Sequence, residues 1–173
     1  MGFVRVASAI PSVAVADVDA NIQSIINQLS KAESEGAKII VFPELCVTSY
    51  TCADLFSQEK LLKKAESALC EIAKYCVDAL VFIGAPLFHD GRVFNCAVAM
   101  NGGKIIGVVP KTFLPNYNEF YEKRWFATSD DLLGNDTITI NGDEYPFGTD
   151  ILFKNKDICI AAEICEDLWT PIP

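Results

Sequence analysis

Residues 79–110, ALVFIGAPLFHDGRVFNCAVAMNGGKIIGVVP, decide the fold of this chain. Three apolar stretches within this region have the length and composition of β-strands. Asp-Gly and Asn-Gly pairs separate the stretches, and such pairs between apolar runs are strong signals of tight hairpin turns. We therefore predict a meander of three strands at residues 79–85, 93–100 and 104–109, with turns at 89–91 and 101–103.

The chain before this meander alternates strand-like and helix-like segments. Apolar residues recur at helical spacing from Val18 to Ala32; Asp17 or Asp19 can cap the start, and Gly36 is placed to end the helix. A second amphipathic pattern lies further along, and short apolar runs flank the two patterns. The predicted order is a strand at 3–10, a helix at 18–32, a strand at 39–42 and a helix at 58–76.

After the meander the pattern is weaker. Residues 111–136 predict a loop with one short helical turn, and apolar runs predict strands at 137–140, 151–153 and 158–164. Strands and helices that alternate before a meander are typical of α/β proteins. We therefore expect one α/β domain, a mixed β-sheet with helices packed on it.

Composition narrows the class of protein. The 173 residues are 51% hydrophobic, which is enough for a real core, and the formal net charge is −9 with no basic run. Such a surface repels a phosphate backbone, so no nucleic-acid partner is expected. No apolar run approaches the ~20 residues that cross a bilayer, so no membrane association is expected. Seven cysteines without a CxxC pair indicate reduced thiols and a cytoplasmic location, and the single histidine, His89, argues against a metal site.

Three apolar runs end directly before a chemically reactive side chain. The runs are residues 38–43, 104–110 and 157–164, and the side chains that follow them are Glu44, Lys111 and Cys165. Ligands of open α/β sheets bind outside the carboxyl ends of the strands. We therefore expect a carboxylate, an ammonium and a thiol in one pocket.

This trio suits acyl transfer. A free thiol has a pKa of ~8.5, so Glu44 as general base and Lys111 as cation would help form the thiolate of Cys165. Lys111 and the backbone N–H of Glu166 would stabilise an oxyanion. The predicted reaction is attack on an amide or nitrile carbon, a thioester, then hydrolysis. Taken singly, each residue is more often a loop residue or a buried thiol, and that alternative stays open.

Three motifs identify a resemblance. Val41-Phe-Pro-Glu-Leu45, Lys111-Thr-Phe-Leu-Pro-Asn-Tyr117 and Glu163-Ile-Cys-Glu-Asp-Leu-Trp169 together resemble the nitrilase (carbon–nitrogen hydrolase) superfamily. Residues 116–126, NYNEFYEKRWF, and the CEDLW of residues 165–169 look like the glutaminase domains of glutamine-dependent NAD+ synthetases. The resemblance implies half of a nitrilase-like αββα sandwich, with helices on one face of a mixed sheet. Residues 1–173 would then be a partial domain, truncated at its C-terminal end.

The resemblance also implies roles for individual residues. Glu44 would be the general base, Lys111 the oxyanion-stabilising group and Cys165 the nucleophile. Glu122 would be a second carboxylate close to the Lys–Cys pair. The resemblance further places Tyr117 in contact with substrate, and Tyr50 and Phe120 in the pocket lining. Glu163 and the six other cysteines receive no role.

The implied function is that of a glutamine amidohydrolase that supplies ammonia to a synthetase domain. No Gly/Ser-rich ATP loop is present in the chain, so ATP and Mg²⁺ are expected only in the synthetase domain, with no cofactor here. Two alternatives remain. One is another superfamily amidase that acts on a different small amide or nitrile. The other is a catalytically incomplete fragment with a structural or interaction role. Truncation predicts weak or absent turnover by the isolated chain. It also predicts an unpaired sheet edge, and therefore a homo-oligomer or an aggregation-prone monomer.

Overall fold

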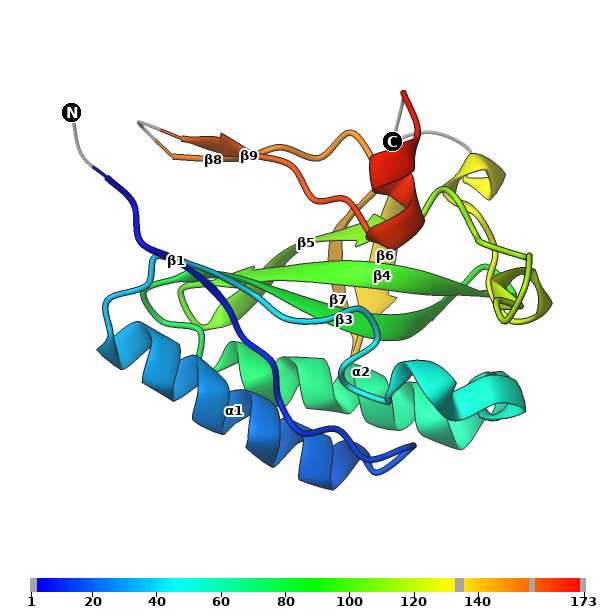
Figure 1. Ribbon diagram of the computed structural model, residues 1–173, viewed down its shortest axis with the longest axis horizontal. Helices are drawn as coiled ribbons and strands as arrows, with labels where there is room; N and C mark the ends of the chain where they lie inside the picture. Colours follow the sequence, from blue (N-terminus) through cyan, green and yellow to red (C-terminus); the bar gives the residue numbers. More distant parts are fainter. Residues whose placement is uncertain (1–2, 133–135, 156–157, 172–173) are drawn as a thin grey trace.

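The computed structural model describes residues 3–132, 136–155 and 158–171, and a mixed seven-stranded sheet is its centre (Figure 1). The strand order is β1-β2-β3-β4-β5-β7-β6. β1, β2 and β3 run parallel, whereas β3, β4 and β5 form the antiparallel meander. The strands are β1 (Val6–Ser8), β2 (Ile39–Val41), β3 (Leu80–His89), β4 (Arg92–Asn101), β5 (Lys104–Pro110), β6 (Asp136–Ile140) and β7 (Asp143–Phe147).

Two helices, α1 (Val18–Ser34) and α2 (Glu59–Ala73), cover one face of this sheet (Figure 1). The Asp17 side chain accepts a hydrogen bond from Ala20 N at 3.2 Å and caps α1. Gly36, with φ +82°, follows the end of the helix. Both ends were predicted. The α/β class and the helices on one face of a mixed sheet are therefore confirmed.

The main core lies between the helices and the sheet. Ile25 and Leu29 of α1 and Leu69 and Ile72 of α2 are fully buried there, together with Ile83 of β3. Burial of this apolar surface provides the main drive for folding. The helical spacing of these residues is what made both helices visible in the sequence.

The opposite face of the sheet carries the end of the chain. A two-stranded pair, β8 (Phe153–Lys154) and β9 (Cys159–Ile160), lies there together with the 3-10 turn η4 (Cys165–Trp169) (Figure 1). Phe153 packs edge-on against Phe82 of β3, with ring centroids 5.4 Å apart. The remaining short helices are η1 (Tyr50–Ser57), η2 (Glu122–Arg124) and η3 (Ser129–Asp131).

Two predicted strands are shorter than expected. The strand expected at 3–10 is only β1, because its partner β2 is three residues long and stops before Pro43. The run 158–164 pairs only at β9. Within the described chain, residues 161–164 join no strand, since this segment lies across the face of the sheet instead of extending its edge.

The strand pair after the meander was only half predicted. β6 was expected, but β7 was not, because Asp143, Glu144 and Pro146 are poor strand formers. Asn141 and Gly142, both with positive φ, form the tight turn that pairs the two strands. The strand expected at 151–153 is β8, which begins at Phe153. Within the described residues, no helix combines the length and apolar character needed to cross a bilayer.

Candidate active site

The Lys111 ammonium is the centre of the site. Its side chain is 0% exposed and follows directly after β5. Nζ lies 2.7 Å from Glu44 Oε1 and 2.8 and 2.9 Å from the two oxygens of Glu122. Burial lowers the pKa of Lys111, but the two carboxylates outweigh burial and raise that pKa above its usual range. A permanent positive charge is therefore held below the protein surface by two negative ones.

Close backbone packing brings Glu44 to this point. Glu44 lies in the turn after β2, and that turn crosses Gly84 of β3. A Cβ on Gly84 would lie 2.4 Å from Leu45 N and 2.5 Å from Pro43 O. Val47 N donates to Gly84 O at 3.2 Å. Only glycine allows the carboxylate to approach this closely, and no local pattern in the chain indicates this requirement.

Glu122 is fixed from the other side. Its carboxylate is buried in η2 and accepts a hydrogen bond from the Tyr50 hydroxyl at 2.7 Å. Burial raises the pKa of Glu122, while the Lys111 ammonium opposes that rise. Asp54 joins the two short helices, since it accepts from Arg124 Nε at 2.7 Å and from Trp125 Nε1 at 2.9 Å. The Tyr50 hydrogen bond and the Asp54 contacts between the two short helices together hold Glu122 in the site.

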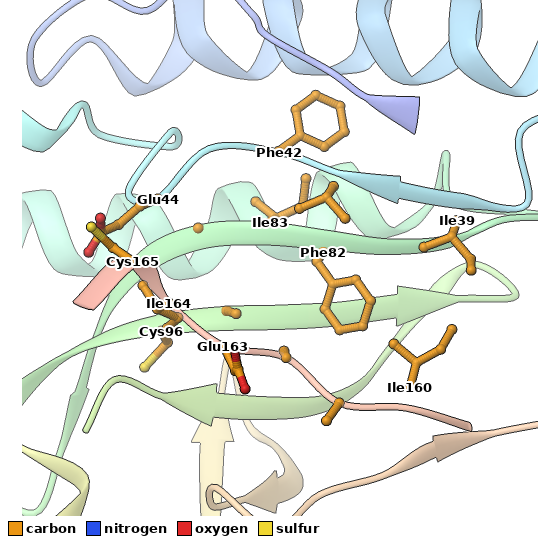
Figure 2. A pocket seen from close by; sticks show the side chains of 15 residues that line it. Ile39, Phe42, Glu44, Phe82, Ile83, Cys96, Ile160, Glu163, Ile164 and Cys165 are labelled. Atoms are coloured by element: carbon orange, nitrogen blue, oxygen red, sulfur yellow. The ribbon is translucent and has the colours of Figure 1, made fainter. Parts of the chain in front are cut away.

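Cys165 approaches from the face opposite the helices. It begins η4 with φ +49°, an uncommon backbone conformation for a residue with a side chain, and its side chain is exposed. It was expected directly after a strand that runs to Ile164, but that strand stops at Ile160 and Cys165 begins a short 3-10 turn. Figure 2 shows its thiol beside the Glu44 carboxylate, and both line a cavity of about 240 Å³ over β2, β3 and β4.

The surroundings keep the Cys165 thiol protonated. Partial desolvation raises its pKa, the Glu44 carboxylate raises it further, and the Lys111 ammonium opposes both. A thiol in this state needs a base to become a nucleophile. The Glu44 carboxylate lies beside the thiol and lines the same cavity (Figure 2).

Asp167 couples this turn to the lysine. Its buried carboxylate accepts from Thr112 N at 3.2 Å and Phe113 N at 2.8 Å through Oδ1, and from Ile164 N at 3.2 Å through Oδ2. Thr112 and Phe113 directly follow Lys111 in the chain. One carboxylate therefore links the turn that carries Cys165 to the segment that follows Lys111.

Comparison with known families decides the class of this site. Residues 5–172 match the family model described as carbon–nitrogen hydrolase. The chain belongs to the carbon–nitrogen hydrolase family. This assignment agrees with the expected resemblance and with a site that joins a thiol, an ammonium and two carboxylates.

Two relatives that match nearly the whole chain are both glutamine-dependent NAD+ synthetases. The glutamine-dependent NAD+ synthetase of Mycobacterium tuberculosis is 40% identical over 99% of the chain, which spans 26% of that protein. A crystal structure of a glutamine-dependent NAD+ synthetase from Cytophaga hutchinsonii matches with a TM-score of 0.89 at 34% identity, over 96% of this chain and 28% of that one. The chain thus spans about a quarter of the length of these relatives.

A more distant structure shares the fold. The amidase from Nesterenkonia sp. AN1, solved as a mutant, matches with a TM-score of 0.63 at 17% identity, over 83% of this chain and 56% of that one. The nitrilase-like α/β fold of this hydrolase is therefore confirmed at the level of architecture.

Not every predicted site residue of this hydrolase meets the cavity. Tyr117 is half-exposed, and its hydroxyl donates to Glu166 at 3.0 Å, next to Cys165. Phe120 packs edge-on against Tyr117, with ring centroids 5.7 Å apart. Glu163, which received no role, lines the cavity with Cys165 and Glu44. The structure thus joins Glu44, Lys111, Glu122 and Tyr50 in one network and leaves the substrate roles of Tyr50, Tyr117 and Phe120 as predictions.

Two polar residues of this site, Asp167 and Asn95, were not predicted from the sequence. Asp167 lay inside the quoted motif but received no role. Asn95, almost fully buried in β4, donates to Glu44 Oε1 at 2.5 Å. A polar residue inside the apolar stretch 93–100 was the available signal. Within the described residues, no group of three or more histidine, cysteine or acidic side chains is placed to hold a metal ion.

Proposed function

We propose that this chain is the glutamine amidohydrolase part of a glutamine-dependent NAD+ synthetase. The arrangement that carries the proposal is the Lys111 ammonium between Glu44 and Glu122, with the Cys165 thiol beside Glu44. The names of the relatives supply the substrate, since the matching proteins are glutamine-dependent NAD+ synthetases. L-glutamine is therefore the proposed substrate.

In the proposed reaction, Glu44 takes the proton from Cys165 Sγ as the sulfur attacks the side-chain amide carbon of glutamine. The carbonyl oxygen becomes an oxyanion, and Lys111 Nζ and the backbone N–H of Glu166 stabilise it. The C–N bond then breaks, and Glu44 returns the proton to the departing nitrogen. Ammonia leaves, and a γ-glutamyl thioester remains on the sulfur.

Water completes the cycle. Glu44 takes a proton from a water molecule that attacks the thioester carbon, and the thiol is regenerated as glutamate leaves. Glu122 keeps its position at Lys111 through both steps, because Tyr50 and Lys111 hold its two oxygens. The second carboxylate thereby fixes the ammonium where the oxyanion forms.

The released ammonia would serve a synthetase domain elsewhere in the full-length protein. The relatives carry that name and are about four times as long as this chain. We propose that ATP and Mg²⁺ act at that domain and that the residues described above need no cofactor. Ammonia is then the single product that passes from this domain to the other.

Ammonia release from glutamine tests this function. The protein and Cys165→Ala are incubated with glutamine, and Cys159→Ala serves as the matched control, because Cys159 is the second exposed cysteine of the described chain. We expect ammonia from the protein and from Cys159→Ala but none from Cys165→Ala. Equal release from all three would remove Cys165 as the nucleophile.

The substrate is tested separately. The same protein is offered glutamine, other ω-amides, carbamoyl amines and nitriles at equal concentration. Preference for glutamine supports the NAD+ synthetase assignment. Preference for another amide or a nitrile would assign the chain to a different amidase of the same family.

A further inference from the structure

The two oxygens of Glu44 have unequal surroundings. Oε1 accepts hydrogen bonds from Lys111 Nζ at 2.7 Å and from Asn95 Nδ2 at 2.5 Å. Among the residues that the structure describes, none donates a hydrogen bond to Oε2. A carboxylate with one oxygen fixed and the other available is well arranged to accept a proton at a defined place.

Asn95 contacts both members of the Glu44–Lys111 pair. Its side chain holds Glu44, and its backbone carbonyl accepts from Lys111 N at 2.8 Å. Asn95 lies in β4, between β3 and β5, and is 1% exposed. Its backbone is therefore held by the central strands, and the side chain cannot move without disturbing them.

The amide of Asn95 has only one sensible orientation. With Nδ2 toward Glu44, the buried Oδ1 has no hydrogen-bond partner in the described structure. The reverse orientation would set Oδ1 against a carboxylate oxygen, which repels it. An unpaired buried acceptor is destabilising, so a residue kept only for stability would satisfy both of its polar atoms.

We infer that Asn95 is a positioning residue for the general base: it fixes Glu44 Oε1 so that Oε2 faces the Cys165 thiol. A neutral amide suits this task. A second cation in its place would compete with Lys111 and weaken the basicity of the carboxylate, and an acid would repel it. The inference rests on the proposed role of Glu44 as base, but it does not depend on glutamine as the substrate.

A chromogenic acyl donor tests the inference without glutamine. p-Nitrophenyl acetate acylates a thiol and releases p-nitrophenol, which is followed at the wavelength where p-nitrophenol and p-nitrophenolate absorb equally. The burst on Cys165 is the difference between a protein and the same protein with Cys165→Ala. At about pH 6 the Cys165 thiol is protonated, so the burst depends on a base. At about pH 10 part of the thiol has ionised without help, even though its surroundings raise its pKa, and the burst depends less on the base. We expect Asn95→Leu to slow the burst about tenfold or more at the lower pH and by a clearly smaller factor at the higher.

A double-mutant cycle shows whether Asn95 acts through Glu44. In the Glu44→Gln background, Asn95→Leu is expected to change the burst rate by less than about twofold, because the base that Asn95 positions is gone. Asn101→Leu is the matched control: Asn101 is the last residue of the same strand, where its side chain donates to Ala79 O at 2.9 Å. This control is expected to keep the normal pH dependence of the burst.

Two results would overturn the inference: equal slowing by Asn95→Leu at both pH values, or slowing that adds to that of Glu44→Gln. If Asn95→Leu does not fold, Asn95→Ala removes the donor without adding bulk or charge and is held to the same criteria. If the protein shows the Asn95-dependent burst but does not hydrolyse glutamine, the inference stands and the proposed substrate is wrong. The absence of any Cys165-dependent burst overturns both.

Discussion

The proposed base and the proposed nucleophile of this site are held in different ways. Lys111 and Glu122 are buried, and with Glu44 they form a network that the sheet and two short helices fix from several sides. Cys165 stands on an exposed five-residue turn, and the buried carboxylate of Asp167 is its link to the lysine segment. Changes in the network should therefore affect stability and activity together, whereas changes in the turn should affect activity first.

The largest effect is expected at the centre of the network. Lys111→Met would leave the buried Glu122 carboxylate and the partly buried Glu44 carboxylate side by side without their cation. Breaking a buried ion pair in this way costs about 3–5 kcal/mol. Urea unfolding should show that loss, together with loss of ammonia release.

Lys64→Met is the control for this prediction. Its ammonium pairs with Asp19 on the surface, and exposed pairs contribute about 0–1 kcal/mol. If the two variants lost equal stability, the buried network would contribute no more to the free energy of unfolding than a surface ion pair.

The next largest effect is expected at Gly84, where the network depends on close backbone approach. In Gly84→Ala, the new methyl group meets backbone atoms of residues 43–45, which cannot move away without moving Glu44. We expect a loss of about 1–3 kcal/mol in the free energy of unfolding and a clear fall in kcat.

Gly107→Ala provides the comparison. Its methyl group would meet the Phe153 ring at 3.1 Å, and a side chain can adjust where backbone cannot. It should retain kcat. Equal kcat in both variants would show that the Glu44 turn tolerates displacement.

A smaller effect is expected in the exposed turn. Asp167→Asn replaces one acceptor oxygen by a donor, so either Ile164 N or the N–H groups of Thr112 and Phe113 lose their partner. We expect kcat to fall about tenfold, with about 1–2 kcal/mol of stability lost. Asp130→Asn, on the exposed η3 turn, should change neither. A stability loss as large as that of Lys111→Met would remove the contrast between turn and network.

The smallest effect is expected on the pKa of the Cys165 thiol. Burial and the negative charge of Glu44 raise the pKa of Cys165, and the positive charge of Lys111 lowers it. Glu44→Gln should therefore move the Cys165 pKa down, and Lys111→Met should move it up. Thiolate absorbance near 240 nm, taken as the difference from the matching Cys165→Ala protein, measures both shifts. Shifts of the same sign in the two variants would contradict the arrangement of charges.

The same contrast explains how much the sequence revealed. Strands and helices with regular apolar spacing were predicted. Glu44 and Lys111 were predicted because each directly follows an apolar run, and Glu122 was predicted from the resemblance. Asn95 and Asp167 were missed because their partners lie 51 and 55 residues away in the chain. Contacts of that separation depend on how the sheet assembles, and local pattern does not encode them.

The most direct test uses a glutamine analogue that carries a diazoketone in place of its amide. The residue to which this analogue becomes covalently attached is determined. Peptide mapping by mass spectrometry locates the adduct on the protein. We expect a single adduct on Cys165 that glutamine suppresses and that forms more slowly in Glu44→Gln. Labelling that glutamine does not suppress, or that falls equally on the exposed Cys159, would contradict this expectation.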